Sequence, residues 1–133
     1  MKNILVTGGA GFIGSNFIHY LLHQESDVRI INLDALTYAG SMENIKDLPS
    51  PERHLFIHGN ITDRALLDQL FAEHKIDTVV NFAAESHVDR SILNPGGFVE
   101  TNVVGTYTLL EAARRAWLVD KIVPLENTRF HHV

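Results

Sequence analysis

The sequence predicts an α/β fold in which a doubly wound parallel sheet is covered by helices on both sides. Three observations lead to this prediction. Short β-branched runs alternate with longer stretches of helical spacing, the strand segments are apolar on both faces, and a glycine-rich turn joins the first strand to the first helix. Right-handed crossovers then favour five strands in the order 3-2-1-4-5.

The first half of the chain supplies three strands and one helix. Residues 4–6 are predicted as the first strand, residues 28–33 as the second and residues 54–58 as the third. After the glycine turn, apolar side chains recur at helical spacing and are expected to face the sheet. This stripe consists of Ile13, Phe17, Ile18, Leu21 and Leu22.

The second half continues the alternation. Asp63 suits the N-cap of a helix that turns Leu66, Leu67, Leu70 and Phe71 inward. Residues 78–82 are the fourth strand, Asn94 and Pro95 open a long helix that reaches about Trp117, and residues 129–133 are the fifth strand. No covering helix follows Val133. We therefore expect a single domain, residues 1–133, that is truncated before further strands and before a substrate domain.

Composition excludes several classes of protein. A net charge of −5 without a basic block argues against nucleic acid or an anionic membrane as a partner. The absence of cysteine excludes disulfides, zinc-thiolate sites and thiol nucleophiles. No apolar stretch is long enough for a signal peptide or a membrane span.

One pair of histidines has the spacing of metal ligands. His19 and His23 share one helical face, but no carboxylate lies at useful spacing, so we expect no metal site. We expect a cytoplasmic protein.

The turn after the first strand has the spacing of a phosphate-binding loop. Its glycines fit G-x-G-x-x-G at Gly9, Gly11 and Gly14, and Gly8 extends the pattern. Such a turn lets the first helical N–H groups, those of Phe12 and Ile13, point at a pyrophosphate. Ser15 stands where a P-loop would have lysine, which excludes that motif. The remaining alternative is a tight strand–helix connection without a ligand.

Asp34 lies at the end of the second predicted strand, 20 residues after Gly14. A carboxylate at this distance can accept hydrogen bonds from the hydroxyls of an adenine ribose. A 2′-phosphate there would meet repulsion of about 4 kcal/mol per pair of unit charges near a protein surface. Ala35 follows Asp34, so no arginine neutralises that repulsion. The sequence therefore predicts NAD rather than NADP, unless Asp34 only caps a loop.

Four segments together resemble the dTDP-glucose 4,6-dehydratases of the extended short-chain dehydrogenase/reductase family. They are residues 7–14, 34–40, 83–91 and 101–106, and the resemblance covers essentially the whole chain. It implies an NAD-dependent lyase: NAD oxidises C4 of the glucosyl ring, water is lost across C5 and C6, and the hydride returns to C6. The product is a 4-keto-6-deoxy sugar nucleotide, a precursor of rhamnose and other deoxysugars. The resemblance also implies a homodimer of the full-length protein.

The resemblance assigns roles to particular residues. Asp34, Ala35, Leu36 and Thr37 surround the ribose, and Phe12 and Ile13 meet the pyrophosphate. Asn60 and Ile61 border the adenine where the family usually has Asp-Ile, and the Asn60 side-chain oxygen can accept a hydrogen bond. Thr101 is a further cofactor contact. Phe82, Ala83, Ala84, Glu85 and Ser86 line the nicotinamide side, and Ser86 also faces the nucleotide-sugar substrate.

The catalytic residues of that family are not expected in these 133 residues. The family carries a Thr-Asp-Glu run after the fifth strand and a Tyr-x-x-x-Lys pair. Tyr20, Tyr38 and Tyr107 are followed four residues later by Gln24, Met42 and Glu111. We therefore expect NAD binding without turnover by this chain alone. A non-catalytic NAD-binding module and another NAD-dependent sugar-nucleotide enzyme, an epimerase or a decarboxylase, remain the alternatives.

Overall fold

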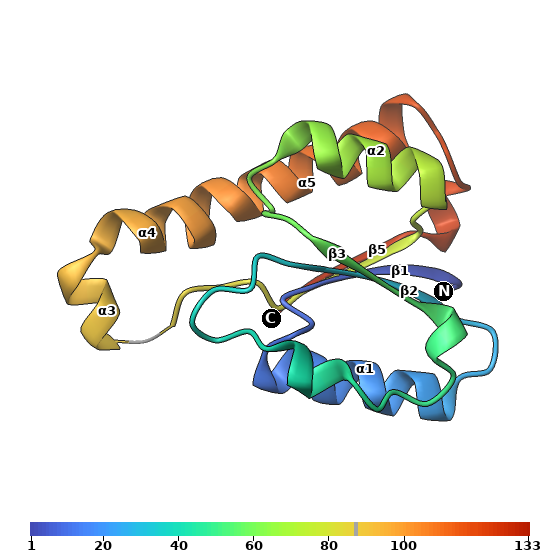
Figure 1. Ribbon diagram of the computed structural model, residues 1–133. Coiled ribbons are helices and arrows are strands. Elements are labelled where there is room, and N and C mark those ends of the chain that lie inside the picture. Colours follow the sequence, from blue (N-terminus) through green and yellow to red (C-terminus); the bar gives the residue numbers. More distant parts are fainter. Residues whose placement is uncertain (87) are drawn as a thin grey trace.

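The computed structural model describes residues 1–86 and 88–133. His87, which belongs to the 83–91 segment of the resemblance, lies outside the described residues. A parallel sheet of order β3-β2-β1-β4-β5 lies between two helical layers (Figure 1). The strands are β1 (Asn3–Thr7), β2 (Arg29–Asp34), β3 (His54–His58), β4 (Thr78–Asn81) and β5 (Arg129–His132). The predicted fold class and strand order are confirmed.

Each face of the sheet has its own apolar core. Helix α1 (Phe12–Gln24) covers one face, and α2 (Arg64–His74) and α5 (Thr106–Arg114) cover the other (Figure 1). Side chains alternate along β1, so that Ile4 and Val6 belong to the α1-side core and Leu5 to the α2-side core. All three are fully buried. This two-sided burial explains why the strands read as continuous apolar runs.

The predicted burial of one residue of the α1 stripe, Ile13, is wrong. Ile13 is 63% exposed, whereas Ile18, Leu21 and Leu22 are buried and Phe17 is half-buried. Ile13 is the second residue of α1, in the turn that follows the carboxyl end of β1. The first helical turn therefore lies at the rim of the sheet, where no strand residue can cover it.

The predicted long helix is an unbroken helical path, but it is not uniform. It consists of α4 (Pro95–Val99), a π-helical segment (Glu100–Gly105), α5 and a second π-helical segment (Arg115–Val119). Its predicted start is confirmed, because the Asn94 side chain accepts a hydrogen bond from the Gly97 N–H. A short helix α3 (Val88–Leu93) precedes it, which the sequence analysis did not predict. Together α3 and α4 extend beyond the sheet as an arm (Figure 1).

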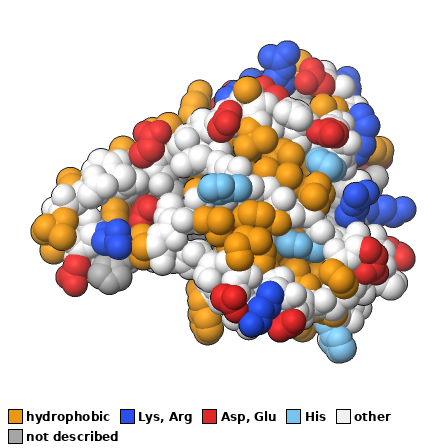
Figure 2. All heavy atoms as spheres, in the orientation of Figure 1, with side chains coloured by type: hydrophobic (Ala, Val, Ile, Leu, Met, Phe, Trp, Pro, Cys, Tyr) orange, Lys and Arg blue, Asp and Glu red, His pale blue; other side chains and the backbone are white. Residues whose placement is uncertain are grey.

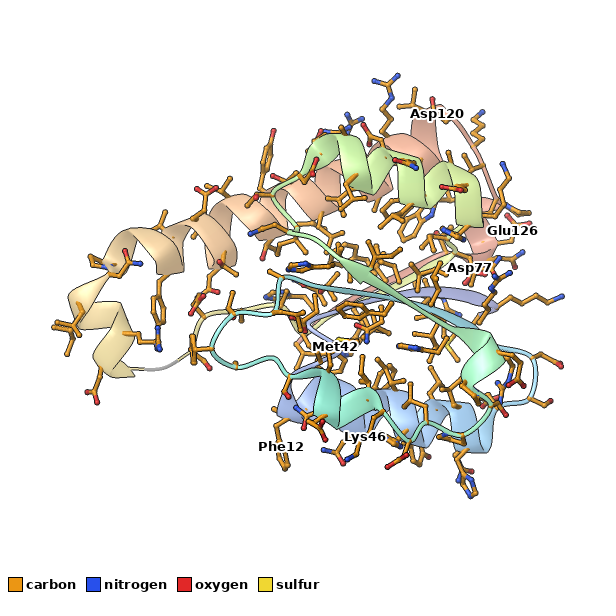
Figure 3. All side chains as sticks on the ribbon, viewed as in Figure 1. Phe12, Met42, Lys46, Asp77, Asp120 and Glu126 are labelled. Carbon is orange, nitrogen blue, oxygen red and sulfur yellow. The ribbon has the colours of Figure 1, made fainter. Side chains whose placement is uncertain are left out.

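Several polar contacts fasten the ends of the elements. The buried Asp77 carboxylate accepts hydrogen bonds of 3.0 Å from the backbone N–H groups of Lys2 and Asn3, which ties β1 to the start of β4 (Figure 3). The Trp117 indole N–H donates to the Ile76 carbonyl at 2.8 Å, and its ring meets Phe71 edge-on.

Asp63 caps α2 as predicted, by accepting a hydrogen bond from the Leu66 N–H. Short 3₁₀ turns occur at Met42–Ile45, Pro51–Arg53 and Leu125–Asn127.

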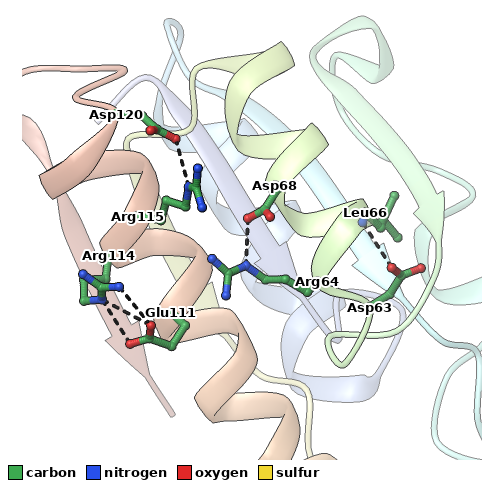
Figure 4. A network of polar contacts seen from close by, with 8 residues as sticks. All are labelled: Asp63, Arg64, Leu66, Asp68, Glu111, Arg114, Arg115 and Asp120. Carbon is green, nitrogen blue, oxygen red and sulfur yellow. Dashed lines mark hydrogen bonds and ion pairs between the residues drawn. The ribbon is translucent and has the colours of Figure 1, made fainter.

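Charged side chains pair on the surface of α2 and around the C-terminal part of the long helical path. Arg64 pairs with Asp68, Arg114 with Glu111, and Arg115 with Asp120 (Figure 4). The hydrogen bond from Arg114 lowers the pKa of the Glu111 carboxyl. Over residues 1–86 and 88–133, no helix is long and apolar enough to cross a bilayer. The cytoplasmic location stays a prediction of the sequence.

We expect the stability of the fold to fall in mild acid because of His54. Burial lowers the pKa of His54 below its ordinary 6.5, and its Nε2 lies 3.2 Å from the Nδ2 of the fully buried Asn32. The unfolded chain therefore binds a proton at His54 more readily than the folded chain does, so the free energy of unfolding decreases as the pH falls through about 6.5. Urea unfolding at pH 7.5 and 5.5 measures this decrease.

The matched variants are His54→Gln and, on the exposed end of the same strand, His58→Gln. The pH dependence is expected to be smaller in His54→Gln than in the parent chain, and unchanged in His58→Gln. An equal dependence in all three proteins would show that the acid sensitivity comes from other groups.

Candidate functional site

A cleft opens at the carboxyl edge of β1, β2 and β4, with about 590 Å³ of empty space that includes its open mouth. The glycine turn, the loops after β2 and β4, and the start of the long helical path form its walls. Most of the predicted site residues line it: Gly8, Gly11, Asp34, Ala35, Thr37, Asn60, Ile61, Phe82, Ala83, Ala84, Glu85 and Thr101. In open α/β sheets, ligands bind at this kind of crevice.

Four further residues line the cleft that the sequence analysis did not assign to the site: Leu33, Ala39, Gly40 and Gly59. Ala39 and Gly40 belong to the 34–40 loop used for the resemblance, so that loop carried the signal for them. A side chain at Gly40 would meet the Asp34 carboxylate, because an added Cβ would lie 2.9 Å from its Oδ1. The other predicted residues, Phe12, Ile13, Gly14, Leu36 and Ser86, lie outside the lining.

The start of α1 presents free backbone donors. Gly11 occupies the N-cap and has no side chain to cap the helix. Within the described residues, the N–H groups of Phe12 and Ile13 have no hydrogen-bond partner, as expected for the first turn of a helix. The Phe12 side chain is 81% exposed and points away from the sheet (Figure 3). Phe12 and Ile13 can therefore contribute to a site only through their amides, which suit an anion.

Gly8 and Gly14 give the turn its shape. Gly8 has a φ of +72°, a conformation that L side chains rarely adopt. A Cβ on Gly14 would lie 2.3 Å from the Gly8 carbonyl oxygen. Gly14 therefore acts from outside the cleft, by letting α1 pack closely on the turn.

The Asp34 carboxylate is held in place by backbone hydrogen bonds. It is 8% exposed, and its two oxygens accept hydrogen bonds of 2.8 Å from the N–H groups of Ala10 and Leu36. The Leu36 N–H bonds a side chain only two residues before it, and Leu36 itself adopts a left-handed φ of +54°. A carboxylate offers about four lone-pair positions, so about two remain for ligand hydroxyls.

Asn60 lines the cleft as predicted, but the side-chain atom that it can offer to a ligand is not the predicted oxygen. Its Oδ1 already accepts two hydrogen bonds from Thr62, from the N–H at 3.0 Å and the hydroxyl at 2.9 Å. The oxygen predicted as an acceptor for the ligand is thus occupied, and the group left for a ligand is the Nδ2 donor. The adjacent Ile61 is 4% exposed and packs against Gly105, where an added Cβ would lie 2.6 Å from the Ile61 side chain.

The loop after β4 is held at both ends. The Phe82 ring packs on Phe17 at 5.3 Å between centroids. The Asn102 side chain makes two hydrogen bonds of 2.8 Å to Glu85, since its oxygen accepts from the backbone N–H and its nitrogen donates to the carbonyl. The Ser86 N–H donates to the Tyr38 hydroxyl at 3.4 Å. Asn102 received no role from the sequence, although it follows the predicted contact Thr101.

We expect Asn102→Leu to weaken NAD binding about tenfold, because two backbone hydrogen bonds that position the loop are lost, each worth about 0.5–1.5 kcal/mol. The dissociation constant for NADH, measured by fluorescence titration, tests this. Asn127→Leu, at an exposed asparagine after α5, serves as the control. Equal affinities of Asn102→Leu and the parent chain would mean that the loop holds its place without this clamp.

Comparison with known proteins gives consistent matches. The family model described as GDP-mannose 4,6 dehydratase matches residues 5–133. The dTDP-glucose 4,6-dehydratase of Shigella flexneri is 48% identical over 130 residues, which is 98% of this chain and 36% of the relative. That of Xanthomonas campestris pv. campestris (strain B100) is 51% identical over 133 residues, which is 100% of this chain and 37% of the relative. This chain thus spans little more than a third of these curated relatives.

Solved structures agree with this result. DesIV, a dTDP-glucose 4,6-dehydratase from Streptomyces venezuelae with NAD and TYD bound, matches with a TM-score of 0.80 and 48% identity, over 86% of this chain and 36% of that chain. A UDP-glucose 4-epimerase from Thermotoga maritima matches with a TM-score of 0.76 and 33% identity, over 86% of this chain and 35% of that chain. The resemblance inferred from the sequence is confirmed.

Proposed function

Because the chain belongs to the family described as GDP-mannose 4,6 dehydratase, we propose that residues 1–133 are the NAD-binding portion of a dTDP-glucose 4,6-dehydratase. The observation that carries the proposal is that Asp34 and the glycine turn line one crevice, and that the helix opened by this turn begins with the unpaired amides of Phe12 and Ile13. Donors for a pyrophosphate and acceptors for ribose hydroxyls are the two requirements of an adenine dinucleotide.

Each wall of the cleft has a separate task in this proposal. The first turn of α1 holds the pyrophosphate, Asp34 orients the adenine ribose, and the Nδ2 of Asn60 meets the adenine. The loop from Phe82 to Glu85 holds the nicotinamide end, and Ser86, which follows it, faces the sugar nucleotide. When bound, NAD supplies a hydride acceptor for the oxidation of the sugar and returns the hydride later.

Selectivity for NAD follows from the charge of Asp34. The carboxylate is nearly buried, and its two backbone hydrogen bonds hold it in place. A 2′-phosphate would bring close to two negative charges against it. Ala35 next to it offers no compensating cation.

Titration of the purified chain with NADH, followed by competition with NAD and NADP, tests the binding part of the proposal. We expect NAD to displace NADH at concentrations at least tenfold below those that NADP requires. Displacement by NADP at equal or lower concentration, or no NADH signal, would contradict it.

Incubation with dTDP-glucose tests the catalytic part. The 133 residues contain no Tyr-x-x-x-Lys pair to abstract the proton of the C4 hydroxyl, so we expect them to produce no 4-keto-6-deoxy sugar. The intact gene product should form it, as mass spectrometry of the nucleotide sugars would detect.

Two other outcomes would favour the alternative functions. NAD binding by an intact gene product that leaves dTDP-glucose unchanged would favour the non-catalytic module, and formation of dTDP-galactose would favour an epimerase. Epimerases among the solved structures share 31–33% identity with the chain, against 44–48% for the dehydratases, which supports the dehydratase.

We also propose that the long helical path pairs with a second copy of the protein. Val99, Val103, Tyr107 and Leu110 recur at helical spacing on its outer side, and each is at least 45% exposed. Figure 2 shows further hydrophobic side chains at the tip of the arm, where Ile92 is 74% and Leu93 is 85% exposed. Contiguous apolar surface of this kind marks an interaction site. Light scattering of the parent chain and of Val103→Glu should give a dimer and a monomer, respectively; a monomeric parent chain would contradict the pairing.

A further inference from the structure

The two loops that flank the cleft touch each other beyond it. Tyr38, on the loop after β2, lies between Thr37 and Ala39, which line the cleft, but is itself outside the lining. Its ring stacks under the Arg90 guanidinium of α3, with 4.1 Å from Cζ to the ring centre. Its hydroxyl accepts from the Ser86 N–H at 3.4 Å. We call the stacking of the Tyr38 ring under Arg90 the strap.

Each loop is anchored at its base by contacts that do not involve the strap. The loop after β2 is fixed to the glycine turn, since the Ser41 N–H and the Asn44 side chain both donate to the Ala10 carbonyl, at 3.0 and 2.8 Å. The loop after β4 is fixed by the Asn102 clamp on Glu85. The bases of both walls are therefore set by other residues, and the strap joins only their outer ends.

A dinucleotide bound in this cleft would lie between the two loops. Its adenosine half lies by Asp34, on the wall that carries Tyr38, and its nicotinamide half lies by Phe82 to Glu85, on the wall that continues into α3. The strap joins these two walls beyond the residues that line the cleft. Tyr38 is 41% exposed and Arg90 is exposed, so the contact is at the surface and can open without disturbing either core.

We propose that Tyr38 and Arg90 control the rate at which NAD enters and leaves the cleft, and that the strap has to open for both events. This inference rests on the proposed NAD site. A strap that has to open before entry and again before exit raises both barriers, so its removal lowers the barrier to entry and to exit together. The affinity then stays nearly constant, which distinguishes the strap from a residue that contacts the cofactor directly.

Stopped-flow fluorescence with NADH measures the two rate constants, by mixing for association and by displacement with excess NAD for dissociation. We expect Tyr38→Leu and Arg90→Gln to raise both rate constants about two- to fivefold, the factor that corresponds to one exposed cation–π contact. The dissociation constant should change less than twofold. The double variant should be no faster than either single variant, because both remove the same contact.

A conservative variant and two distant variants serve as controls. Tyr38→Phe keeps the ring under Arg90 and should retain the parent rates. Tyr20→Leu on α1 and Arg29→Gln at the start of β2 remove an exposed residue of the same type far from the cleft and should change neither rate. Thermal melting checks that each variant is folded; if Tyr38→Leu is not, Arg90→Gln decides the test.

Three results would overturn the strap: unchanged rates in both single variants, a rise in dissociation alone, or a Tyr38→Phe variant as fast as Tyr38→Leu. A rise in dissociation alone would make these residues direct cofactor contacts. Failure of the proposed NAD site gives a different result, because the parent chain would then show no NADH signal at all.

Discussion

Gly14→Ala is expected to abolish measurable NAD binding and to lower the stability of the chain, whereas Gly11→Ala should lower NAD affinity alone. At Gly14 the added Cβ would lie 2.3 Å from the Gly8 carbonyl oxygen and 2.9 Å from the Gly9 Cα, and both are backbone atoms that cannot rotate away. The helix has to move off the turn. Overpacking of this kind costs about 1–3 kcal/mol, and the shift also displaces the amides at the start of α1.

Gly11 offers the matched comparison because the protein leaves room for a methyl group there. Its φ of −79° is open to any residue, and the nearest atom to an added Cβ is the Gly8 carbonyl oxygen at 3.4 Å. Gly11 lines the cleft, however, so the methyl group would occupy the space into which the pyrophosphate has to come. We therefore expect Gly11→Ala to melt within a few degrees of the parent chain and to bind NAD at least tenfold more weakly.

The two substitutions together separate the packing of the turn from its contact with the cofactor. Thermal melting and NADH titration of both variants are sufficient. Parent-like NAD affinity in Gly11→Ala would mean that the phosphates do not approach this turn, and the proposed site would have to be abandoned.

Asp34→Asn is expected to weaken NAD binding by about 10- to 150-fold, the range for losing a hydrogen bond to a charged group at about 1.5–3 kcal/mol. The effect has two origins. The carboxylate accepts from two backbone N–H groups, and an asparagine can accept only one of them through Oδ1, while its Nδ2 faces the other donor. The same change removes the charged acceptor for the ribose hydroxyls.

The preference between the two cofactors should change in the opposite sense. With the charge gone, the repulsion of a 2′-phosphate disappears, so the ratio of the NADP and NAD dissociation constants should fall at least tenfold in Asp34→Asn. Asp47→Asn, at an exposed aspartate in the connection between β2 and β3, is the control and should leave both constants unchanged. A ratio that stays the same would show that another group excludes the phosphate.

Sequence periodicity was sufficient for the parts of the fold that are buried on both sides. The centres of β1 and β4, residues 4–6 and 79–80, are apolar because helices cover both faces of the sheet, and the caps at Asp63 and Asn94 depend on residues only three positions apart. α3 escaped prediction because it has six residues and no apolar stripe to fill a core. Ile13 was misplaced because helical spacing does not show where the sheet beneath a helix ends.

The candidate site was predictable where it depends on a local motif and unpredictable where it depends on contacts between loops. The glycine turn and Asp34 lie at a spacing set by one strand–helix–strand unit. The Asn102 clamp joins residues on separate elements, and the strap joins the loops after β2 and β4. The Asn60 oxygen is occupied because its side chain turns toward Thr62, and the sequence analysis did not consider this local contact.

The division of the interior into two cores also bears on the order in which the chain can acquire structure as it leaves the ribosome. All buried members of the α1-side core except Val80 belong to the first 48 positions, and β1 pairs directly with β2. The nascent segment can therefore bury most of that face early in translation. The opposite face waits first for α2 and then for Leu109 to Trp117, so the half-made sheet exposes that face, with Leu5 and Ile31, to chaperones and to neighbouring chains for longer.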